Sequence, residues 1–153
     1  MVAQKTFKIK ELTPADLQAV LEIEYRCFPD PYPLSLLEQL YSSYPRGFIG
    51  AELEGRLVGY LIFTMRWGGI GHILSLAVDP PYQRRGIGSA LVRKALEDLK
   101  ADGARTVRLE ARKSNIGARM FYLTLGFKEE RELPHYYEDG ETAVLMWYTY
   151  PNT

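Results

Sequence analysis

The stretch DPPYQRRGIGSALV, from Asp79 to Val92, places two glycines directly behind two arginines. It lies where an apolar, strand-like run ends and a helix-like pattern begins. The first N–H groups of a helix and the positive end of its dipole attract anions, and glycine lets an anion come close to the backbone. Gly86 and Gly88 therefore predict a phosphate-binding loop, with a tight turn that binds nothing as the alternative.

Two common nucleotide-binding loops do not fit these residues. A Walker loop needs Gly-Lys-Ser/Thr, and RRGIGSA contains no lysine. A dinucleotide fingerprint needs glycine or alanine three places after the second glycine, where Leu91 stands. It also needs a tight turn from strand to helix, and here DPPYQ intervenes. The remaining interpretation of these residues is a helix N-terminus that can bind an anion.

The elements around this loop are predicted from periodicity and turn residues. TFKIKEL alternates like a strand, and TPADLQAVLEIEYRCF is typical of a helix with Thr13 as its cap and Pro14 in its first turn. Glu54-Gly55 predicts a hairpin turn. The whole pattern predicts the order β-α-α-β-β-β-α-β-α-β-β, an α/β (α+β) chain with a mixed sheet and helices packed on it.

Two of the predicted helices have an apolar stripe at helical spacing. The first is expected to bury Leu17, Val20, Leu21 and Tyr25. The helix behind the glycines is expected to bury Ile87, Leu91, Ala95 and Leu99, and to end at Gly103.

Composition favours one ordinary globular domain over residues 1–153, with no repeat and no linker. Apolar residues make up 46% of the chain, and 19 basic residues balance 19 acidic ones, which gives no reason to expect nucleic acid as a partner. One cysteine, Cys27, excludes an internal disulfide. No apolar run is long enough for a signal peptide or a membrane span, so a cytoplasmic protein without membrane contact is expected.

Three segments together resemble the GNAT acetyltransferases. VDPPYQRRGIGSALV is similar to the family's acetyl-coenzyme A motif, Gln/Arg-x-x-Gly-x-Gly/Ala, filled by Gln83, Gly86 and Gly88. LEARKSNIGARMFYLTLGF resembles the second cofactor segment, with Asn115 and Tyr122 in the matching places. HYYEDGETAVLM resembles the C-terminal strand pair of protein N-terminal acetyltransferases, of the ribosomal-protein-alanine and archaeal types. The similarity runs from TFKIKEL to WYT.

The resemblance implies a twisted, mostly antiparallel sheet of about seven strands flanked by four helices, with acetyl-coenzyme A as cosubstrate and no metal. Backbone N–H groups from Arg84 to Ser89 would hold the pyrophosphate, and the strand Leu76 to Val78 would pair with the pantetheine arm. Arg84 and Arg85 would add charge, or simply lie in solvent. The implied cofactor-binding residues are Leu76, Ala77, Val78, Gln83, Arg84, Arg85, Gly86, Ile87, Gly88, Ser89, Asn115 and Tyr122.

Acetyl transfer to an amine needs a base for the amine proton and a donor that stabilises the thioester oxygen. The resemblance puts Glu110 at a known base position; its alternative is a surface glutamate paired with Arg108 or Arg112. His72 is a second base candidate, or a partly buried loop histidine. Tyr122 matches the general acid, or packs in the core beside Phe121. The family transfers acetyl directly, so Cys27 is not needed to carry an acyl group. It is therefore expected to be a buried small residue.

The resemblance also implies an entrance for a peptide. Its walls would come from CFPDPYPLSLL and from the last hairpin, and they predict an acceptor whose first residue is small or apolar. The implied substrate-binding residues are Phe28, Pro29, Asp30, Tyr32, Leu74, Tyr136 and Tyr137.

The predicted activity is therefore transfer of acetyl from acetyl-coenzyme A to the N-terminal amine of a protein or peptide, with a ribosome or an auxiliary subunit as a further partner. Two alternatives stay open. One is a GNAT enzyme that acts on a lysine side chain or a small-molecule amine. The other is a noncatalytic coenzyme A-binding subunit.

Overall fold

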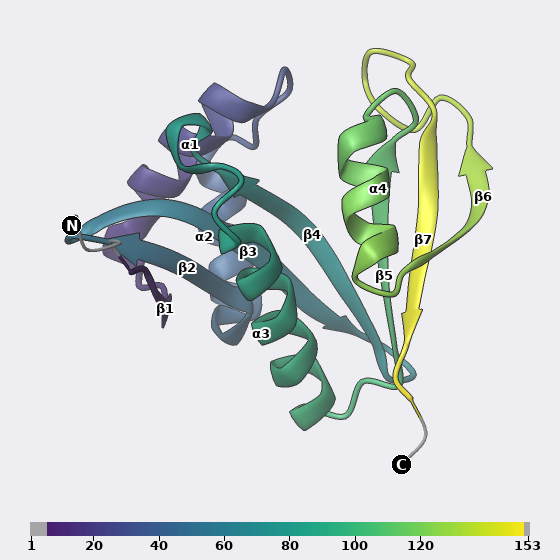
Figure 1. Ribbon diagram of the computed structural model, residues 1–153, viewed down its shortest axis with the longest axis horizontal. Helices are drawn as coiled ribbons and strands as arrows, with labels where there is room; N and C mark the ends of the chain where they lie inside the picture. Colours follow the sequence, from purple (N-terminus) through teal and green to yellow (C-terminus); the bar gives the residue numbers. More distant parts are fainter. Residues whose placement is uncertain (1–5, 152–153) are drawn as a thin grey trace, which may run out of the picture. The chain divides into compact units, whose positions relative to one another are not determined.

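The computed structural model describes residues 6–151 and contains four helices and seven strands (Figure 1). The helices are α1 (Leu17–Cys27), α2 (Leu34–Ser43), α3 (Ile87–Ala101) and α4 (Ile116–Thr124). The strands are β1 (Lys8–Glu11), β2 (Phe48–Leu53), β3 (Arg56–Arg66), β4 (Ile70–Val78), β5 (Thr106–Arg112), β6 (Lys128–Leu133) and β7 (Ala143–Thr149). The predicted order of elements is confirmed.

The strands are hydrogen-bonded in the order β1-β2-β3-β4-β5-β7-β6. The pairs β1–β2, β2–β3, β5–β7 and β6–β7 are antiparallel, whereas β4 and β5 are parallel. The predicted seven-stranded, mostly antiparallel sheet with four helices is therefore confirmed.

The chain divides into two compact units, and β4 contributes to both. The first unit contains the residues up to Thr64 and the segment Ser75–Asp98. The second contains Met65–Leu74 and the residues from Leu99 onward.

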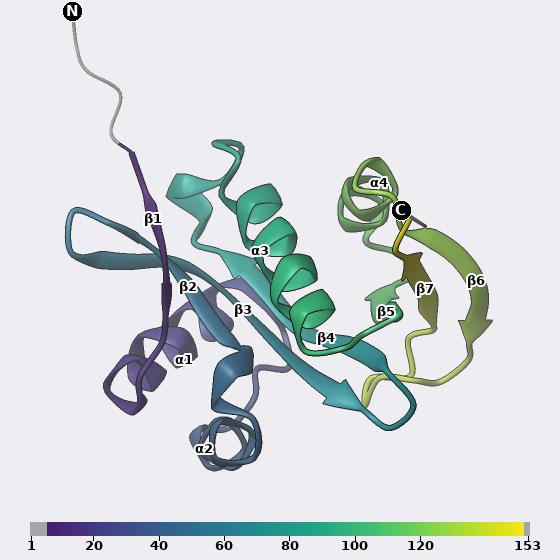
Figure 2. The same ribbon diagram turned by 90° about the horizontal axis from the view of Figure 1, so that it is seen from below.

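In the first unit, α1 and α2 lie on one face of β2 and β3, and α3 lies on the other face (Figures 1 and 2). Tyr41 and Tyr44 pack edge-on against Phe48 and Phe63, with ring centroids 5.2 and 6.0 Å apart. Gly59 of β3 allows a close approach, because an added Cβ would lie 3.2 Å from the Ala77 carbonyl oxygen and 3.3 Å from the Ile87 side chain.

In the second unit, α4 covers β5 and β7 (Figures 1 and 2). The residues of β5 alternate between buried and half-buried. Val107, Leu109 and Ala111 are buried on one face, so Arg108 and Glu110 share the other face. The parallel register places His72 of β4 opposite Arg108. This alternation and this register bring the second unit's charged side chains together.

The apolar stripe on α3 is confirmed, because all four predicted residues are buried. The stripe on α1 is partly wrong. Tyr25 is 65% exposed and Leu21 is half-buried, whereas Ile23 and Glu24 are buried. Glu24 faces inward because its carboxylate accepts hydrogen bonds from the buried Tyr60 and the half-buried Ser75. A stripe of apolar residues does not predict an inward-facing carboxylate.

The remaining local predictions agree with the structure. Thr13 caps the short 3₁₀ turn Pro14–Asp16 ahead of α1, and Asp16 Oδ2 accepts from the Thr13 N–H at 2.8 Å. Glu54 and Gly55 have φ values of 51° and 77°, as a two-residue hairpin turn requires. Within residues 6–151, no helix combines the length and the apolar character that crossing a bilayer requires.

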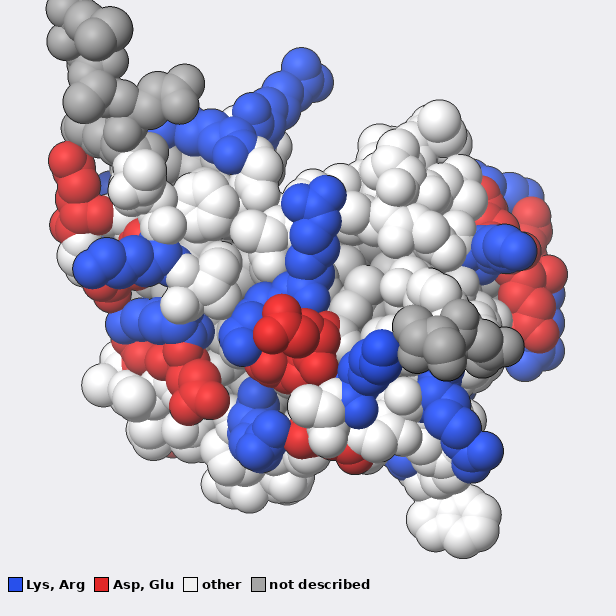
Figure 3. All heavy atoms as spheres, turned by 60° about the horizontal axis from the view of Figure 1, so that its bottom comes forward, with Lys and Arg blue, Asp and Glu red and all other residues white. Residues whose placement is uncertain are grey.

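Charged side chains of both signs lie close together on the face drawn in Figure 3. Among the described residues, Lys10–Glu52 and Lys94–Asp98 form ion pairs that are each 2.9 Å long. A chain with 19 residues of each sign is expected to have such a surface.

Candidate active site

The predicted anion-binding loop lies in the first unit, where the 3₁₀ turn Pro80–Tyr82 leads into α3. Arg84 has φ 65° and Gly86 has φ 82°. A positive φ is costly for arginine, and such strain in a loop is typical of functional sites. Nothing lies within 4 Å of the place where a Cβ on Gly86 would stand. The Ala90 N–H is bonded to the Gly86 carbonyl at 3.1 Å, so the N–H groups of 87–89 precede the first helical bond.

The other side chains of this loop brace it. Gln83 Nε2 donates to the Val78 carbonyl at 2.9 Å. The guanidinium groups of Arg56 and Arg85 lie 5.8 and 5.4 Å from the centroid of the Tyr82 ring. Arg85 therefore lies against an aromatic face, which limits its freedom.

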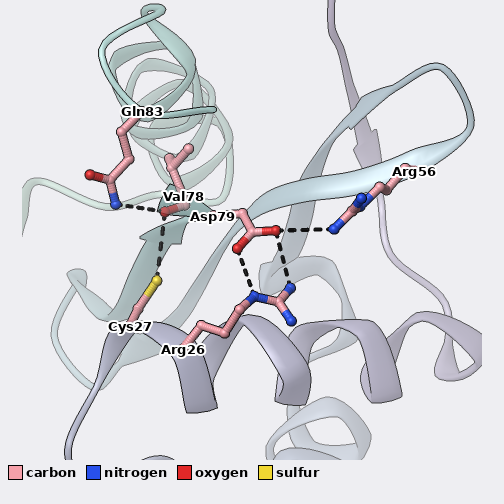
Figure 4. A network of polar contacts seen from close by, with 6 residues as sticks. All are labelled: Arg26, Cys27, Arg56, Val78, Asp79 and Gln83. Atoms are coloured by element: carbon pink, nitrogen blue, oxygen red, sulfur yellow. Dashed lines mark hydrogen bonds and ion pairs between the residues drawn. The ribbon is translucent and has the colours of Figure 1, made fainter. Parts of the chain in front are cut away.

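A buried carboxylate fixes the start of the loop (Figure 4). Asp79 is 1% exposed and follows directly after β4. Its two oxygens accept from Arg26 Nε at 2.7 Å and Arg26 Nη2 at 3.1 Å, and Arg56 Nη2 lies 3.5 Å away. The Asp79 N–H donates to the Val58 carbonyl, and its carbonyl accepts from the Tyr82 N–H, both at 2.8 Å. The end of β4, α1 and the loop are thus joined through the side chain and the backbone of one residue.

Replacing Asp79 with asparagine is expected to lower the free energy of unfolding by about 1–3 kcal/mol, the range for a lost charged hydrogen bond. The loss stays below that of a fully buried ion pair because the Arg26 and Arg56 side chains are 44% and 61% exposed. Urea unfolding measures it. Asp98→Asn in the surface pair with Lys94 is the matched control and should cost at most about 0.5 kcal/mol. Equal losses of unfolding free energy in the two variants would show that the Asp79 contacts with Arg26 and Arg56 do not stabilise the fold.

Cys27 differs from its prediction because it is half-buried rather than buried. Its thiol donates to the Val78 carbonyl at 3.6 Å, the same oxygen that accepts from Gln83 (Figure 4). Burial, followed by the Asp79 charge, raises the pKa of this thiol. A thiol that stays protonated is a poor nucleophile.

The loop of residues 28–33 in the first unit, which is predicted to contact the acceptor, is anchored by the same helix, α1. The buried carboxylate of Glu24 accepts from the Tyr32 N–H at 3.0 Å, from Ser75 Oγ at 2.8 Å and from the Tyr60 hydroxyl. Burial and the nearby Glu24 raise the pKa of Tyr60. Phe28 and Tyr32 are half-buried and Pro29 and Asp30 are exposed. Glu24 therefore fixes the backbone of this loop at Tyr32.

The second unit holds a compact group of charged side chains around Glu110. Glu110 Oε1 lies 2.7 Å from His72 Nε2, and Oε2 accepts from Arg108 Nε at 3.1 Å and Arg108 Nη2 at 2.6 Å. The Glu110 and His72 side chains are 7% and 3% exposed. Arg66 Nε donates to the other ring nitrogen of His72, Nδ1, at 2.8 Å. We call these four residues, Arg66, His72, Arg108 and Glu110, the charged cluster.

Burial alone would raise the pKa of Glu110, but the hydrogen bonds from His72 and Arg108, together with the Arg108 charge, outweigh it and hold that pKa below its usual value. Glu110 is therefore ionised at neutral pH. Tyr136 lies beside it, 47% exposed, and hydrogen-bonds to the carboxylate. Burial and then the Glu110 charge raise the pKa of Tyr136, so its hydroxyl keeps its proton.

The two tyrosines of the last loop stack edge to face, with ring centroids 5.0 Å apart. The Arg112 guanidinium lies 4.1 Å from the Tyr137 ring centroid and pairs with Asp139 and Glu141, both at 2.8 Å. Tyr137 is thus held by β5, whereas Tyr136 reaches Glu110. Leu74, near the middle of β4, is half-buried in the same unit.

Asn115 and Tyr122 lie at the start and near the end of α4. Asn115 Oδ1 accepts from the Ala118 N–H at 3.1 Å, so its role as a helix cap is confirmed. Tyr122 is 9% exposed and packs edge-on against Phe121 and Phe127, with centroids 5.2 and 5.6 Å away. Burial raises the pKa of Tyr122, which therefore stays protonated at neutral pH.

The predicted residues fall into two sets. His72, Leu74, Glu110, Asn115, Tyr122, Tyr136 and Tyr137 belong to the second unit, whereas Phe28, Pro29, Asp30, Tyr32, Leu76, Ala77, Val78, Gln83, Arg84, Arg85, Gly86, Ile87, Gly88 and Ser89 belong to the first. Glu110 pairs with Arg108, as its alternative interpretation predicts, but its side chain is 7% exposed and does not lie on the surface. Its role as a base stays a prediction. His72 is a buried strand residue, not a loop histidine.

Sequence reasoning missed Arg66 and Asp79. Arg66 stands six residues before His72, across the turn at Gly68-Gly69, whose φ values are 81° and 77°. That turn was a signal, since it places residues before and after it on neighbouring strands. Asp79 had no local signal, because its partners Arg26 and Arg56 are distant in sequence.

Comparison with known proteins agrees with these features. The sequence pattern described as the acetyltransferase (GNAT) family matches residues 17–127. The chain is 46% identical over 146 residues to an uncharacterized N-acetyltransferase of Methanocaldococcus jannaschii, covering 94% of this chain and 92% of that protein. It is 35% identical over 154 residues to an N-alpha-acetyltransferase of Sulfurisphaera tokodaii, with 93% and 92% covered.

A solved structure also has a similar fold. The crystal structure of Ard1 from Thermoplasma volcanium superposes with a TM-score of 0.91 at 31% identity, covering 95% of this chain and 99% of that one. The glycine-rich helix start, the order of the strands and the family match over most of the chain lead to one assignment. This chain belongs to the GNAT family and is an acetyl-coenzyme A-dependent acetyltransferase.

Proposed function

We propose that this enzyme transfers acetyl directly from acetyl-coenzyme A to the α-amino group of a protein or peptide N-terminus. The observation that carries the proposal is the ionised, buried Glu110, held by His72 and Arg108 and touched by the exposed Tyr136. The N-alpha-acetyltransferase name of the Sulfurisphaera relative supports it. Residues 1–153 act in this proposal as a single acetyltransferase domain.

The start of α3 suits the diphosphate of acetyl-coenzyme A, which supplies an acetyl group activated as a thioester. The space beside Gly86 is open, so an anion can approach the backbone there. The positive φ of Arg84 and of Gly86 allows successive backbone N–H groups to face that anion. Arg84 and Arg85 add positive charge, and the N–H groups from Ile87 to Ser89 are the donors. The segment Leu76–Val78 of the first unit is proposed to pair with the pantetheine arm. In the second unit, Asn115 is a proposed cofactor ligand, because it uses Oδ1 as a cap and retains the donors of Nδ2.

Glu110 is proposed as the acceptor of the amine proton. An α-amine with a pKa of about 8 is only about one-tenth neutral at pH 7, and a carboxylate with a lowered pKa cannot remove its first proton efficiently. The second proton is different, because the nitrogen becomes acidic once it begins to bond to the acetyl carbon. Glu110 takes that proton directly or through a water molecule. Tyr122, which keeps its proton, is proposed to protonate the departing thiolate.

Direct transfer agrees with the state of Cys27. Its thiol is half-buried, bonded to the Val78 carbonyl, and has a raised pKa. Such a thiol is a weak nucleophile at neutral pH, so an acyl-cysteine step is not part of the proposal.

In the first unit, Phe28, Pro29 and Tyr32 are proposed as residues that contact the acceptor. In the second unit, Leu74, Tyr136 and Tyr137 are proposed for the same role, which suits a small or apolar first residue. Asp30 is exposed and offers a carboxylate to the α-amine or to a polar first side chain. N-termini of this kind are presented in the cytoplasm, where we place the enzyme, and a ribosome or an auxiliary subunit is the partner such a substrate implies.

Tyr32→Ala is expected to raise KM for peptide about tenfold, as loss of an aromatic contact does, and to leave KM for acetyl-coenzyme A unchanged. The backbone bond from the Tyr32 N–H to Glu24 does not depend on the side chain, so the loop keeps its anchor. Steady-state kinetics with each substrate varied in turn measures the effect. Tyr25→Ala, at an exposed tyrosine of α1, is the matched control. Equal KM values for peptide in both variants would exclude Tyr32 from the acceptor site.

A turnover assay on pooled peptides with varied first residues, read by mass spectrometry, tests the activity. We expect acetyl on the N-termini of peptides that begin with small or apolar residues. Acetyl found on lysine side chains, or turnover only with polyamines added in parallel, would overturn the proposal. Binding of acetyl-coenzyme A without any turnover would favour a noncatalytic subunit.

A further inference from the structure

The two ring nitrogens of His72 have different partners. Arg66 Nε donates to Nδ1 at 2.8 Å, and Nε2 lies 2.7 Å from Glu110 Oε1. An arginine side chain has donors only, so Nδ1 must be the acceptor and carries no proton. An ionised carboxylate only accepts, so Nε2 must carry the proton. These contacts define a single neutral tautomer for the ring.

We propose that Arg66 is a positioning residue that holds His72 in the neutral, Nε2-protonated form, so that Glu110 and not His72 accepts the amine proton. This inference rests on the proposed acetyl transfer. It decides between the two base candidates of the second unit and gives Arg66 a role in the reaction. His72 then acts as a fixed hydrogen-bond donor to the Glu110 carboxylate.

Charge and burial both favour this assignment. The groups that face His72 and Glu110 are Arg66 of β3, Arg108 and Glu110 of β5, and the neutral hydroxyl of Tyr136. With His72 neutral, the charged cluster carries two positive charges and one negative charge. A proton on Nδ1 would add a third positive charge, and the N–H of Nδ1 would then point at the N–H of Arg66 Nε.

Water cannot relieve that conflict at a side chain that is 3% exposed. A buried donor without a partner carries a large cost. The single negative charge of Glu110 favours a charged imidazole, but Arg108 already neutralises it from 2.6 Å. Arg66 is therefore the residue that decides the protonation of His72.

The tautomer can be read directly by NMR on the full chain labelled with ¹⁵N in its histidines. The chain contains two histidines, and His135, which is exposed, is the internal reference. We expect His72 to show the neutral Nε2–H pattern at pH 7.5, because Arg66 donates to Nδ1 and Glu110 accepts from Nε2. A doubly protonated or Nδ1-protonated His72 in the wild-type protein would overturn the proposal.

Arg66→Met removes the donor and keeps an unbranched side chain. We expect Nδ1 of His72, which then has no donor facing it, to become available for protonation in this variant. The ratio of its kcat/KM to that of the wild type should fall about fourfold between pH 8 and pH 6, because an ordinary imidazole with a pKa of about 6.5 is about three-quarters protonated at pH 6 and almost wholly neutral at pH 8. Taking the ratio cancels the ionisation of the substrate amine. A ratio that does not change with pH would reduce Arg66 to a structural role.

Two further variants isolate the effect. Arg66→Lys retains a cationic donor and should restore both the tautomer and the flat ratio. Arg131→Met makes the same replacement at an exposed arginine of β6 and should leave both unchanged. The NMR measurement needs no substrate, so it distinguishes failure of this inference from failure of the proposed acetyl transfer. If Arg66→Met does not fold, the spectra of the wild-type protein and of Arg66→Lys still test the tautomer of His72.

Discussion

Glu110→Gln is expected to lower kcat by about 10²–10⁴-fold, the usual loss when a general base is removed, while acetyl-coenzyme A still binds. Glutamine has nearly the same shape and can still accept a hydrogen bond through one oxygen, so the packing around it changes little. It cannot take a proton from the amine, and it leaves Arg108 without its counter-charge. Loss of rate with intact cofactor binding is therefore the expected pattern.

Steady-state kinetics and calorimetry of cofactor binding measure these two quantities. Glu129→Gln is the matched control, because Glu129 also pairs with an arginine of the second unit, Arg119, at 2.8 Å but lies on β6. The control should keep wild-type kcat. A Glu110→Gln enzyme with nearly full activity and an unchanged pH profile would assign the base to another group.

Gly88→Asp is expected to abolish measurable binding of acetyl-coenzyme A. Gly88 is the second residue of α3, where a carboxylate is favourable for the helix itself, so the fold should tolerate it. The same carboxylate would stand where the diphosphate is proposed to bind. Two like charges about 4 Å apart repel by about 4 kcal/mol near a protein surface, which corresponds to an affinity loss of about a thousandfold.

Isothermal calorimetry on folded protein measures this loss. Gly88→Asn adds a side chain of the same size without the charge and should weaken binding much less than the aspartate does. Unchanged affinity in Gly88→Asp would refute the placement of the diphosphate at the start of α3. Equal losses of affinity in the two variants would show that the size of the added side chain, and not its charge, weakens binding.

The elements that carry the candidate site could be predicted where the signals are local. The stripe from Ile87 to Leu99 repeats at helical spacing, and Gly103 ends the helix, with φ 101°. The strand β5 could be predicted from its alternation, which also puts Glu110 and Arg108 on one face. These features depend on neighbours within a few residues, so the sequence contains them.

The polar interior could not be predicted in the same way. Glu24 is buried because Tyr60 and Ser75, far along the chain, donate to it, and a periodicity argument counts glutamate as an outward residue. Asp79 is buried for the same kind of reason. An efficient general base has a pKa near the working pH, whereas the contacts of Glu110 lower its pKa. Only three-dimensional contacts with His72 and Arg108 determine that sign.

The central claim, acetylation of an α-amine, is tested most directly by two matched peptides at pH 7.5. One has a free N-terminus and no lysine, and the other has a blocked N-terminus and one internal lysine. An α-amine with a pKa of about 8 is more often neutral than an ε-amine with a pKa of about 10.4, by a factor of about 10² at this pH. We predict that kcat/KM for the free N-terminus exceeds that for the lysine by more than this factor. A ratio no larger than this factor, or faster turnover of the blocked peptide, would contradict the account and favour a lysine acetyltransferase.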